Sequence, residues 1–193
     1  MDLNNTQTKK NLMKAFAGEC QARSRYEFAA KVAKKEGYPT IEKTFKFIAG
    51  QESYHSKIFY RFLSQFSGGS VEIDNATYPV DLYKTTLEFL SASHKHEMEE
   101  HDVIYKEFGK IAKSEGFDEI SIAFNNIAEI EKTHATKFMS IYEKLNSGSL
   151  FKQSTKVKWF CTNCGYIHEG EEAPNTCPVC NHPQGYFVLL DEF

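Results

Sequence analysis

The sequence predicts a mainly α-helical protein, in which a four-helix bundle is followed by a small C-terminal domain that binds a metal through four cysteines. Three observations lead to this prediction. Apolar side chains recur every three or four residues over most of the first 145 positions, which is the period of amphipathic helices. The helical part contains an internal repeat. Four of the chain's five cysteines fall within its last 33 residues.

The predicted helices are separated by residues that stop or start helices. Gly37 ends the first helix, and Pro39 begins the second in the first turn, where proline is favoured. Residues 66–79 are rich in Gly, Ser and Asn and are expected to form a connection, after which a third helix follows Pro79. The four helices are expected over residues 8–36, 39–66, 80–115 and 118–145. The expected domains are a bundle over 1–146, a polar linker over 147–156 and a metal domain over 157–193.

The internal repeat relates the two halves of the bundle. A shift of 79 positions places residues 26–59 on residues 105–138, and 13 of these 34 positions are identical. About two identities are expected by chance for average composition. The repeat therefore indicates a duplicated helical hairpin and a bundle with approximate two-fold symmetry.

Composition and charge exclude several classes of function. The net charge is −3, so no broad basic surface for nucleic acid is present. The first residues, MDLNNTQTKKNL, lack the apolar core of a signal peptide, and no apolar run approaches the roughly 20 residues of a membrane span. We therefore expect a cytoplasmic protein that binds neither nucleic acid nor membranes. In a reducing cytosol, clustered cysteines favour a metal site over disulfides.

Five acidic side chains are expected to face the interior of the bundle. Residues three apart project from one face of a helix, so two Glu-x-x-His pairs share the apolar stripes of the second and fourth helices. A buried ion pair explains one such pair, but the first and third helices add further inward carboxylates. The set is Glu52 with His55, Glu131 with His134, and Glu19, Glu97 and Glu100.

This set of side chains predicts a metal site. Two imidazoles cannot neutralise five carboxylates, whereas divalent cations can. Carboxylate-rich sites with one imidazole per ion suit iron or manganese. In ferritin-like di-iron bundles, two helices each supply a Glu and the other two each supply Glu-x-x-His, and this chain offers that set with Glu100 as a surplus. The 79-residue shift maps Glu19 onto Met98 rather than Glu97, so the third helix is one residue out of register.

The C-terminal cysteines predict a second metal site. Cys161, Cys164, Cys177 and Cys180 form two CxxC pairs that are separated by twelve residues. Zinc is the commoner ion for this spacing in general. The surrounding CxxCGY and CPxC patterns instead favour a rubredoxin-like iron site, because Gly165 lets backbone amides turn toward the sulfurs.

The chain resembles rubrerythrin over nearly its whole length. The resemblance rests on GECQARSRYEF (18–28), GQESYH (50–55), HEMEEHDVIY (96–105), EIEKTH (129–134) and the cysteine-containing tail. It implies a ferritin-like di-iron bundle fused to a rubredoxin-like domain with one iron. It also implies a peroxidase that reduces hydrogen peroxide to water in an anaerobic or microaerophilic microbe. Electrons would come from NADH through a separate flavoprotein or rubredoxin reductase, and each tail of a head-to-tail homodimer would serve its partner's di-iron site.

The resemblance also implies individual roles. The iron ligands in the bundle would be Glu19, Glu52, His55, Glu97, Glu100, Glu131 and His134, with Glu52 and Glu131 as bridges. One iron would exchange Glu100 for His55 on reduction. Tyr26 and Tyr105 match family tyrosines that hydrogen-bond ligand carboxylates. Cys20 is expected to be a small buried filler rather than an oxidisable thiol.

Two other functions fit part of the sequence. A ferroxidase or iron-storage protein would share the bundle but has no use for a rubredoxin-like tail. A non-catalytic zinc-ribbon protein would share the tail but does not explain five inward carboxylates. The colour of the purified protein distinguishes these cases, because ferric iron bound by four thiolates is red whereas zinc is colourless.

Overall fold

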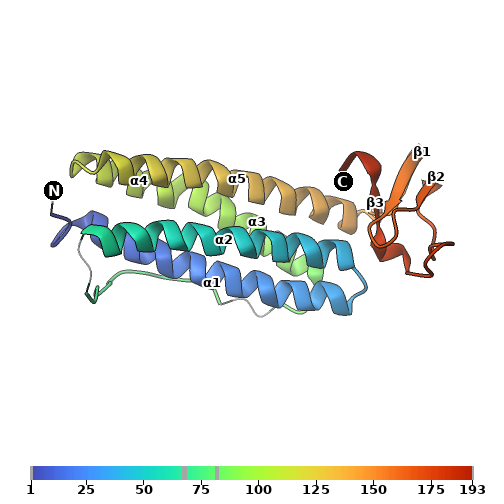
Figure 1. Cartoon of the computed structure of the whole chain (residues 1–193), viewed down its shortest axis with the longest axis horizontal. Coiled ribbons are helices and arrows are strands. Elements are labelled where there is room, and N and C mark those ends of the chain that lie inside the picture. Colours follow the sequence, from blue (N-terminus) through green and yellow to red (C-terminus); the bar gives the residue numbers. More distant parts are fainter. Residues whose placement is uncertain (1, 67–68, 81–82, 193) are drawn as a thin grey trace.

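The computed structural model describes residues 2–66, 69–80 and 83–192. It shows an elongated helical bundle with a small β domain at one end (Figure 1). The helices of the bundle are α1 (Gln7–Lys35), α2 (Pro39–Phe66), α3 (Thr86–Glu99), the π-helix η1 (Glu100–Ile104), α4 (Tyr105–Ser114) and α5 (Asp118–Asn146). The tail contains β1 (Lys152–Cys161), β2 (Ile167–Glu172), the short helix η2 (Gln184–Tyr186), β3 (Phe187–Leu189) and η3 (Leu190–Glu192). The predicted fold class is confirmed.

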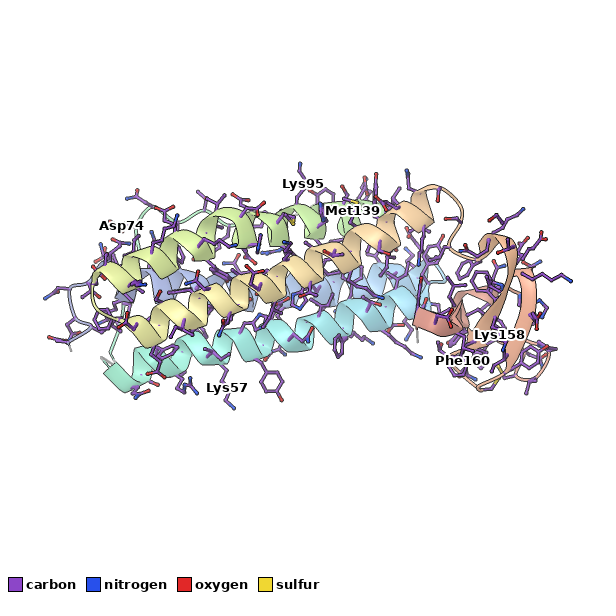
Figure 2. The ribbon with its side chains drawn as sticks, turned by 90° about the horizontal axis from the view of Figure 1, so that it is seen from above. Lys57, Asp74, Lys95, Met139, Lys158 and Phe160 are labelled. Carbon is purple, nitrogen blue, oxygen red and sulfur yellow. The ribbon has the colours of Figure 1, made fainter. Side chains whose placement is uncertain are left out.

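Two helical hairpins build the bundle. Helices α1 and α2 pack along each other, and α3, η1 and α4 form one continuous rod that packs against α5 (Figure 2). The connection between the hairpins runs back along the length of α1 (Figure 1). Part of the predicted connection, residues 67–68, lies outside the described residues.

The third helix begins later than predicted. It starts at Thr86 rather than just after Pro79, because Thr85 and Glu88 form a capping box. The Thr85 side chain accepts a hydrogen bond from the Glu88 amide, and the Glu88 carboxylate accepts one from the Thr85 amide. These bonds satisfy backbone N–H groups that have no partner inside the helix, which fixes the start of α3. Residues 83–85 therefore extend the connection.

The π-helix explains why the repeat is out of register. Glu19 and Tyr26 are seven residues apart, whereas Glu97 and Tyr105 are eight apart. The second hairpin thus contains one extra residue, and η1 lies between Glu97 and Tyr105. A π-helical turn absorbs one residue without rotating the rest of the helix onto another face. Glu97 and Tyr105 therefore both face the interior, as Glu19 and Tyr26 do.

Two aromatic clusters fill the bundle above and below its middle. Tyr26, Phe45 and Phe138 have ring centroids 5.1–6.0 Å apart. The second cluster has centroid distances of 5.0–5.9 Å and consists of Tyr105, Phe124 and Phe59. Each ring in one cluster is the 79-residue equivalent of a ring in the other, so the predicted two-fold symmetry extends to the core. The metal-binding side chains lie between these clusters.

The tail is a three-stranded antiparallel sheet with strand order β2-β1-β3. Strand β1 begins at Lys152, so the second half of the stretch expected to be a linker is part of the sheet, where Lys152 pairs with Glu172. The tail sits against the turn between α1 and α2. A Cβ added at Gly185 would lie 2.0 Å from the carbonyl oxygen of Gly37, so the two backbones are in direct contact there.

Candidate metal centre

Six of the seven predicted ligands of the bundle lie together at the centre of the four helices. Each is at most 5 % exposed: Glu19 from α1, Glu52 and His55 from α2, Glu97 from α3, and Glu131 and His134 from α5. Their donor atoms form two groups of four, within each of which all atoms lie within 4.8 Å of one another. The groups are Glu19, Glu52, His55 and Glu131, and Glu52, Glu97, Glu131 and His134.

Glu52 and Glu131 belong to both groups. Nδ1 of His55 lies 2.8 Å from Glu52 and 2.9 Å from Glu131. Nδ1 of His134 lies 3.1 Å from Glu52 and 2.8 Å from Glu131. Each of these carboxylates therefore places one oxygen on each side, which is the arrangement a bridging carboxylate needs. This geometry is consistent with the bridging roles of Glu52 and Glu131 that the resemblance implied, and these roles stay a prediction.

Two buried tyrosines hold the outer carboxylates. The hydroxyl of Tyr105 donates a hydrogen bond of 2.5 Å to Glu19, and the hydroxyl of Tyr26 donates one to Glu97. Both tyrosines are at most 2 % exposed. Because each bond crosses from one hairpin to the other, the tyrosines fix the distance between hairpins at the level of the site. The two tyrosines are therefore placed where the resemblance implied.

The buried carboxylates of the cluster favour the binding of cations. Burial raises the pKa of Glu19 and Glu97 well above the usual range, and the neighbouring carboxylates raise it further. Several carboxylate oxygens and both histidine Nδ1 atoms are buried without a well-formed hydrogen bond, and all of them face the cluster. Unpaired buried charges are costly, whereas a pair of divalent ions would satisfy these atoms with carboxylate and imidazole ligands. The residues present therefore fit a di-iron site.

Glu100 lies beside the cluster rather than within it. It is the first residue of η1, and it belongs to neither group of four. Burial and the Glu52 carboxylate raise its pKa to about 7, although Arg25 acts in the opposite direction. Its carboxylate also lines a pocket between α1 and the third helical rod. Glu100 is thus the site residue that faces both the metal cluster and an opening.

Sequence reasoning missed Gln51. The Nε2 atom of His134 lies 3.0 Å from Oε1 of Gln51, so the imidazole donates to the amide oxygen while Nδ1 faces the cluster. Metal-binding histidines usually donate their second N–H in this way, which fixes the ring. The repeat places Ile130 at the equivalent position, and no described residue accepts a hydrogen bond from Nε2 of His55. The asymmetry was visible in the repeat alignment, where Gln51 aligns with an apolar residue.

One sequence expectation about this region was wrong. Cys20 was expected to be a buried filler, but its side chain is exposed. Successive residues of a helix point about 100° apart, so the residue after the inward-facing Glu19 turns out of the bundle.

The four cysteines of the tail also come together. Their sulfurs lie within 4.8 Å of one another, with Cys161 3.8 Å from Cys180 and Cys164 3.6 Å from Cys177. Each CxxC forms the same turn. The Gly165 amide donates to the Cys161 carbonyl and the Asn181 amide donates to the Cys177 carbonyl, both at 2.9 Å.

These turns aim backbone amides at the sulfurs. Gly165 and Asn181 occupy the same position in the two turns, and both have positive φ. The amide of His182 hydrogen-bonds Cys180 and, against the effect of burial, lowers the pKa of that thiol to about 6. Amides directed at sulfur in this way tune the potential of a thiolate-bound iron. Gly165 therefore has the role that its place after the second cysteine predicted.

Comparisons with known proteins agree with both sites. The sequence matches the family model described as Rubrerythrin over residues 10–142 and 88–163, and the rubredoxin-like domain of that family over 159–188. It is 45% identical to the rubrerythrin of Clostridium perfringens over 191 residues, which cover 98% of this chain and 97% of that protein. The chain belongs to the rubrerythrin family.

Further rubrerythrins and solved structures support this assignment. The rubrerythrin of Nitratidesulfovibrio vulgaris is 40% identical over 97% of this chain and 96% of its own. A structure of partially reduced nigerythrin superposes with a TM-score of 0.65 at 25% identity, over 97% of this chain and 91% of that one. The bacterioferritin of Desulfovibrio desulfuricans shares the fold of the bundle, with a TM-score of 0.65 at 20% identity over 74% of this chain and 82% of that one.

Membership of this family places the protein among the di-iron oxidoreductases. The bundle carries a carboxylate and histidine di-iron site, and the tail carries a four-cysteine rubredoxin-like iron site. Which individual side chains bind each ion stays a prediction. In the part of the chain that the structure describes, no helix is both long and apolar enough to cross a membrane.

Proposed function

We propose that this rubrerythrin is a peroxidase that reduces hydrogen peroxide to water. The observation that carries the proposal is the combination, in one chain, of two adjoining groups of candidate ligands that both contain Glu52 and Glu131 with a cluster of four cysteines. Reduction of one peroxide to two waters consumes two electrons and two protons. Two reduced irons held by the carboxylates and histidines of the bundle would supply these electrons, and an iron held by the four cysteines would supply their replacements singly.

The chain itself supplies groups for the protons and for positioning. Glu100 lies beside the cluster and lines the pocket, so its carboxyl is placed to pass protons between the pocket and the cluster. Tyr26 and Tyr105 hold the outer carboxylates Glu97 and Glu19 in place, so these two groups need not reorganise during the reaction. The proposed exchange of Glu100 for His55 on reduction is consistent with their positions, because Glu100 lies beside the group of four that contains His55.

The tail's position supports transfer of electrons between chains. Gly185 touches Gly37, next to the start of α2 at Pro39, and Glu52 lies 13 residues further along that helix. At 1.5 Å per residue this is about 20 Å of helix between the tail and the bridging carboxylate of the same chain. We propose a head-to-tail homodimer in which each tail instead approaches its partner's di-iron site.

Charge is consistent with such a dimer. Residues 157–193 contain one lysine and five acidic residues. Residues 1–146 contain 20 lysines and arginines and 21 acidic residues, of which the five inward carboxylates belong to the metal site. The outside of the bundle is therefore basic and the tail is acidic, so the tail of one copy is attracted to the bundle of another. We propose NADH as the electron source, delivered to the tail iron by a reductase in the cytoplasm.

Anaerobic oxidation of the fully reduced protein tests the peroxidase. Reduced protein is mixed with hydrogen peroxide or with dioxygen in a stopped-flow instrument, and the red absorbance of the tail iron is followed. We expect hydrogen peroxide to oxidise both sites much faster than dioxygen does. Faster oxidation by dioxygen would contradict the proposed peroxidase function and would favour a ferroxidase.

A further inference from the structure

A glycine occupies a buried position in the middle of α1 next to the metal site. Gly18 is buried, and its backbone has no positive φ that would require a glycine. Glycine inside a helix costs about 1 kcal/mol relative to alanine, so an interior glycine usually has a steric reason. A Cβ built at this position would point at Cε1 of Tyr78, 3.7 Å away, and at Oε1 of Glu100, 4.0 Å away. The missing side chain thus leaves space between Tyr78 and Glu100.

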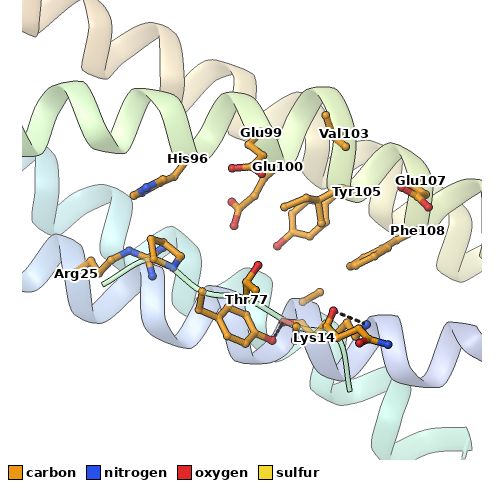
Figure 3. Close-up of a pocket in the computed structure, with 17 residues that line it drawn as sticks. Lys14, Arg25, Thr77, His96, Glu99, Glu100, Val103, Tyr105, Glu107 and Phe108 are labelled. Atoms are coloured by element: carbon orange, nitrogen blue, oxygen red, sulfur yellow. Dashed lines mark hydrogen bonds between the residues drawn. The ribbon is translucent and has the colours of Figure 1, made fainter. Parts of the chain in front are cut away.

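That space is the inner end of a pocket. The pocket has a volume of about 520 Å³ and lies between α1, η1, α4 and the connection at residues 75–79. Glu100 and Tyr105 point into it, as Figure 3 shows. Tyr105 lines the pocket and hydrogen-bonds Glu19 of the metal cluster, so at this point a single side chain lies between the pocket and a cluster carboxylate.

The connection forms the outer wall of the pocket. The hydroxyl of Tyr78 donates a hydrogen bond of 3.0 Å to the carbonyl oxygen of Lys14, which holds the Tyr78 ring across α1 opposite Gly18. The rest of the lining combines apolar residues, including Ala15, Ile104 and Phe108, with charged ones, including Lys14, Arg25 and Glu107. The opening is therefore bounded by fixed groups and not only by mobile surface side chains.

The pocket is much larger than hydrogen peroxide requires. A water molecule occupies roughly 30 Å³ in the liquid, and hydrogen peroxide is about the size of two waters. Pockets of several hundred Å³ with mostly apolar walls and a few polar groups at one end are typical of sites for small organic molecules. Here Glu100 and Tyr105 lie on the side of the metal cluster, and Ala15, Ile104 and Phe108 supply apolar wall that an organic group can contact.

We propose that this pocket is the entrance to the metal pair, that Gly18 sets its width, and that it admits small organic hydroperoxides as well as hydrogen peroxide. The inference rests on the peroxidase function proposed above and extends its substrate class. The O–O bond of the hydroperoxide would break with two electrons from the reduced metal pair and two protons, giving one alcohol and one water. The peroxide end would lie against Glu100, and the organic group would lie along Ala15 and Phe108.

Substitution of Gly18 tests the entrance. Gly18→Leu fills the space between Tyr78 and Glu100, and Gly18→Ala adds a single methyl at ordinary contact distance and serves as a milder variant. Gly50→Leu is the matched control, because Gly50 is an exposed helix-interior glycine on α2 with nothing within 4 Å of its would-be Cβ. The fully reduced proteins are oxidised by hydrogen peroxide and by tert-butyl hydroperoxide under anaerobic conditions, and second-order rate constants are compared.

We expect the wild-type protein and Gly50→Leu to react with both peroxides. In Gly18→Leu the rate constant for tert-butyl hydroperoxide should fall about tenfold more than that for hydrogen peroxide, which is the range by which one added group in a pocket discriminates substrates. Gly18→Ala should show the same trend to a smaller degree. No reaction of the wild-type protein with tert-butyl hydroperoxide, or equal effects on the two peroxides, would overturn the proposed substrate class.

A binding measurement separates the entrance from the peroxidase chemistry. Azide is titrated into each variant with cobalt(II) in the bundle, and the visible spectrum of the cobalt reports the dissociation constant. We expect a higher dissociation constant in Gly18→Leu and an unchanged one in Gly50→Leu. An unchanged dissociation constant for azide in Gly18→Leu would show that the pocket is not the entrance to the metal pair, even if the protein is a peroxidase. A raised constant in a protein that reacts with neither peroxide would support the entrance but reject the peroxidase, and with it the substrate class.

Discussion

Tyr105 on α4 donates a hydrogen bond of 2.5 Å to Glu19 on α1, and so ties the two hairpins together beside the metal cluster. Tyr26, the equivalent tyrosine of the first hairpin, donates the corresponding hydrogen bond to Glu97. We expect Tyr105→Phe to weaken metal binding in the bundle about 10- to 100-fold, as loss of a group that orients a ligand usually does. Competition with a chelator measures this affinity. Tyr60→Phe, at a tyrosine that is 56% exposed, is the control. Equal affinities in Tyr105→Phe and the control would show that the bond does not orient Glu19.

The shared position of Glu52 leads to a second prediction. Glu52→Ala removes oxygens that face both histidines and leaves the remaining carboxylates close together. We expect loss of both irons and of peroxidase activity, while the red colour of the tail persists because the cysteines are untouched. Metal analysis and the visible spectrum measure both effects. Glu119→Ala, at an exposed residue of α5, should behave as wild type. Retention of two irons by Glu52→Ala would exclude a bridging role.

Gln51 predicts a difference between the two histidines. Gln51 fixes the His134 ring, whereas the equivalent Ile130 offers His55 no acceptor. We expect Gln51→Leu to free the His134 ring and to lower metal affinity about tenfold. Ile130→Gln should instead anchor His55 and slow any exchange between His55 and Glu100. Nitrogen NMR of the imidazoles in zinc-loaded protein reports ring protonation and exchange of the Nε2 proton.

The expected result of that NMR measurement is specific to each variant. The slowly exchanging Nε2 proton of His134 should disappear in Gln51→Leu, and a second such proton should appear in Ile130→Gln. A slowly exchanging His134 proton that survives Gln51→Leu would mean that another group orients the ring.

The buried carboxyls predict an unusual pH dependence for the metal-free protein. Burial raises the pKa of Glu19, Glu97 and Glu131 well above the usual range, and that of Glu100 to about 7. A carboxyl with a raised pKa binds its proton more tightly in the folded state. Such a carboxyl therefore makes its full contribution to stability at pH values below about 4.3, which is its pKa in the unfolded chain. The contribution is lost as the pH rises through the pKa that the carboxyl has in the folded state.

Burial lowers the pKa of His55, but the carboxylates of Glu52, Glu19 and Glu100 together raise it by more, so His55 acts in the same direction as these carboxyls. We therefore expect the thermal midpoint of the metal-free protein to fall between pH 5.5 and 8. The metal-loaded protein should show the opposite trend over the acidic part of this range, because metals bind the deprotonated ligands. Calorimetry of both forms measures the effect, and Glu100→Gln should flatten the profile of the metal-free form. A metal-free midpoint that rises with pH would contradict the assigned shifts.

The tail contacts the α1–α2 turn, far along α2 from the bridging carboxylate of its own chain. We therefore expect two inactive variants to restore each other's activity when they form a mixed dimer. Cys161→Ala combined with Cys164→Ala disables the tail iron, and Glu52→Ala disables the bundle. If electrons cross between chains, co-expressed heterodimers should regain peroxidase activity with a reductase as donor, because one intact tail faces one intact bundle. The two parents assayed alone are the controls. Heterodimers that form but stay inactive would place the electron path within one chain.

Much of the site could be predicted from the sequence because its determinants are local. Glu52 and His55 share a helix face because residues three apart always do, and the CxxC spacing brings two sulfurs into one turn. The 79-residue repeat then implied a second copy of the same pair at Glu131 and His134. These patterns depend on contacts within a few residues, which the chain order specifies directly.

Other features depended on how the helices meet, and only the tertiary structure decided them. The bond from His134 to Gln51 joins residues 83 positions apart, so no local pattern reveals it. The start of α3 at Thr86 depended on a capping box that competes with a continued helix after Pro79. The space at Gly18 follows from which neighbours α1 meets, namely Tyr78 and Glu100. Side-chain identity determined which groups could bind a metal, but the packing of two hairpins determined where those groups meet and from which side a substrate reaches them.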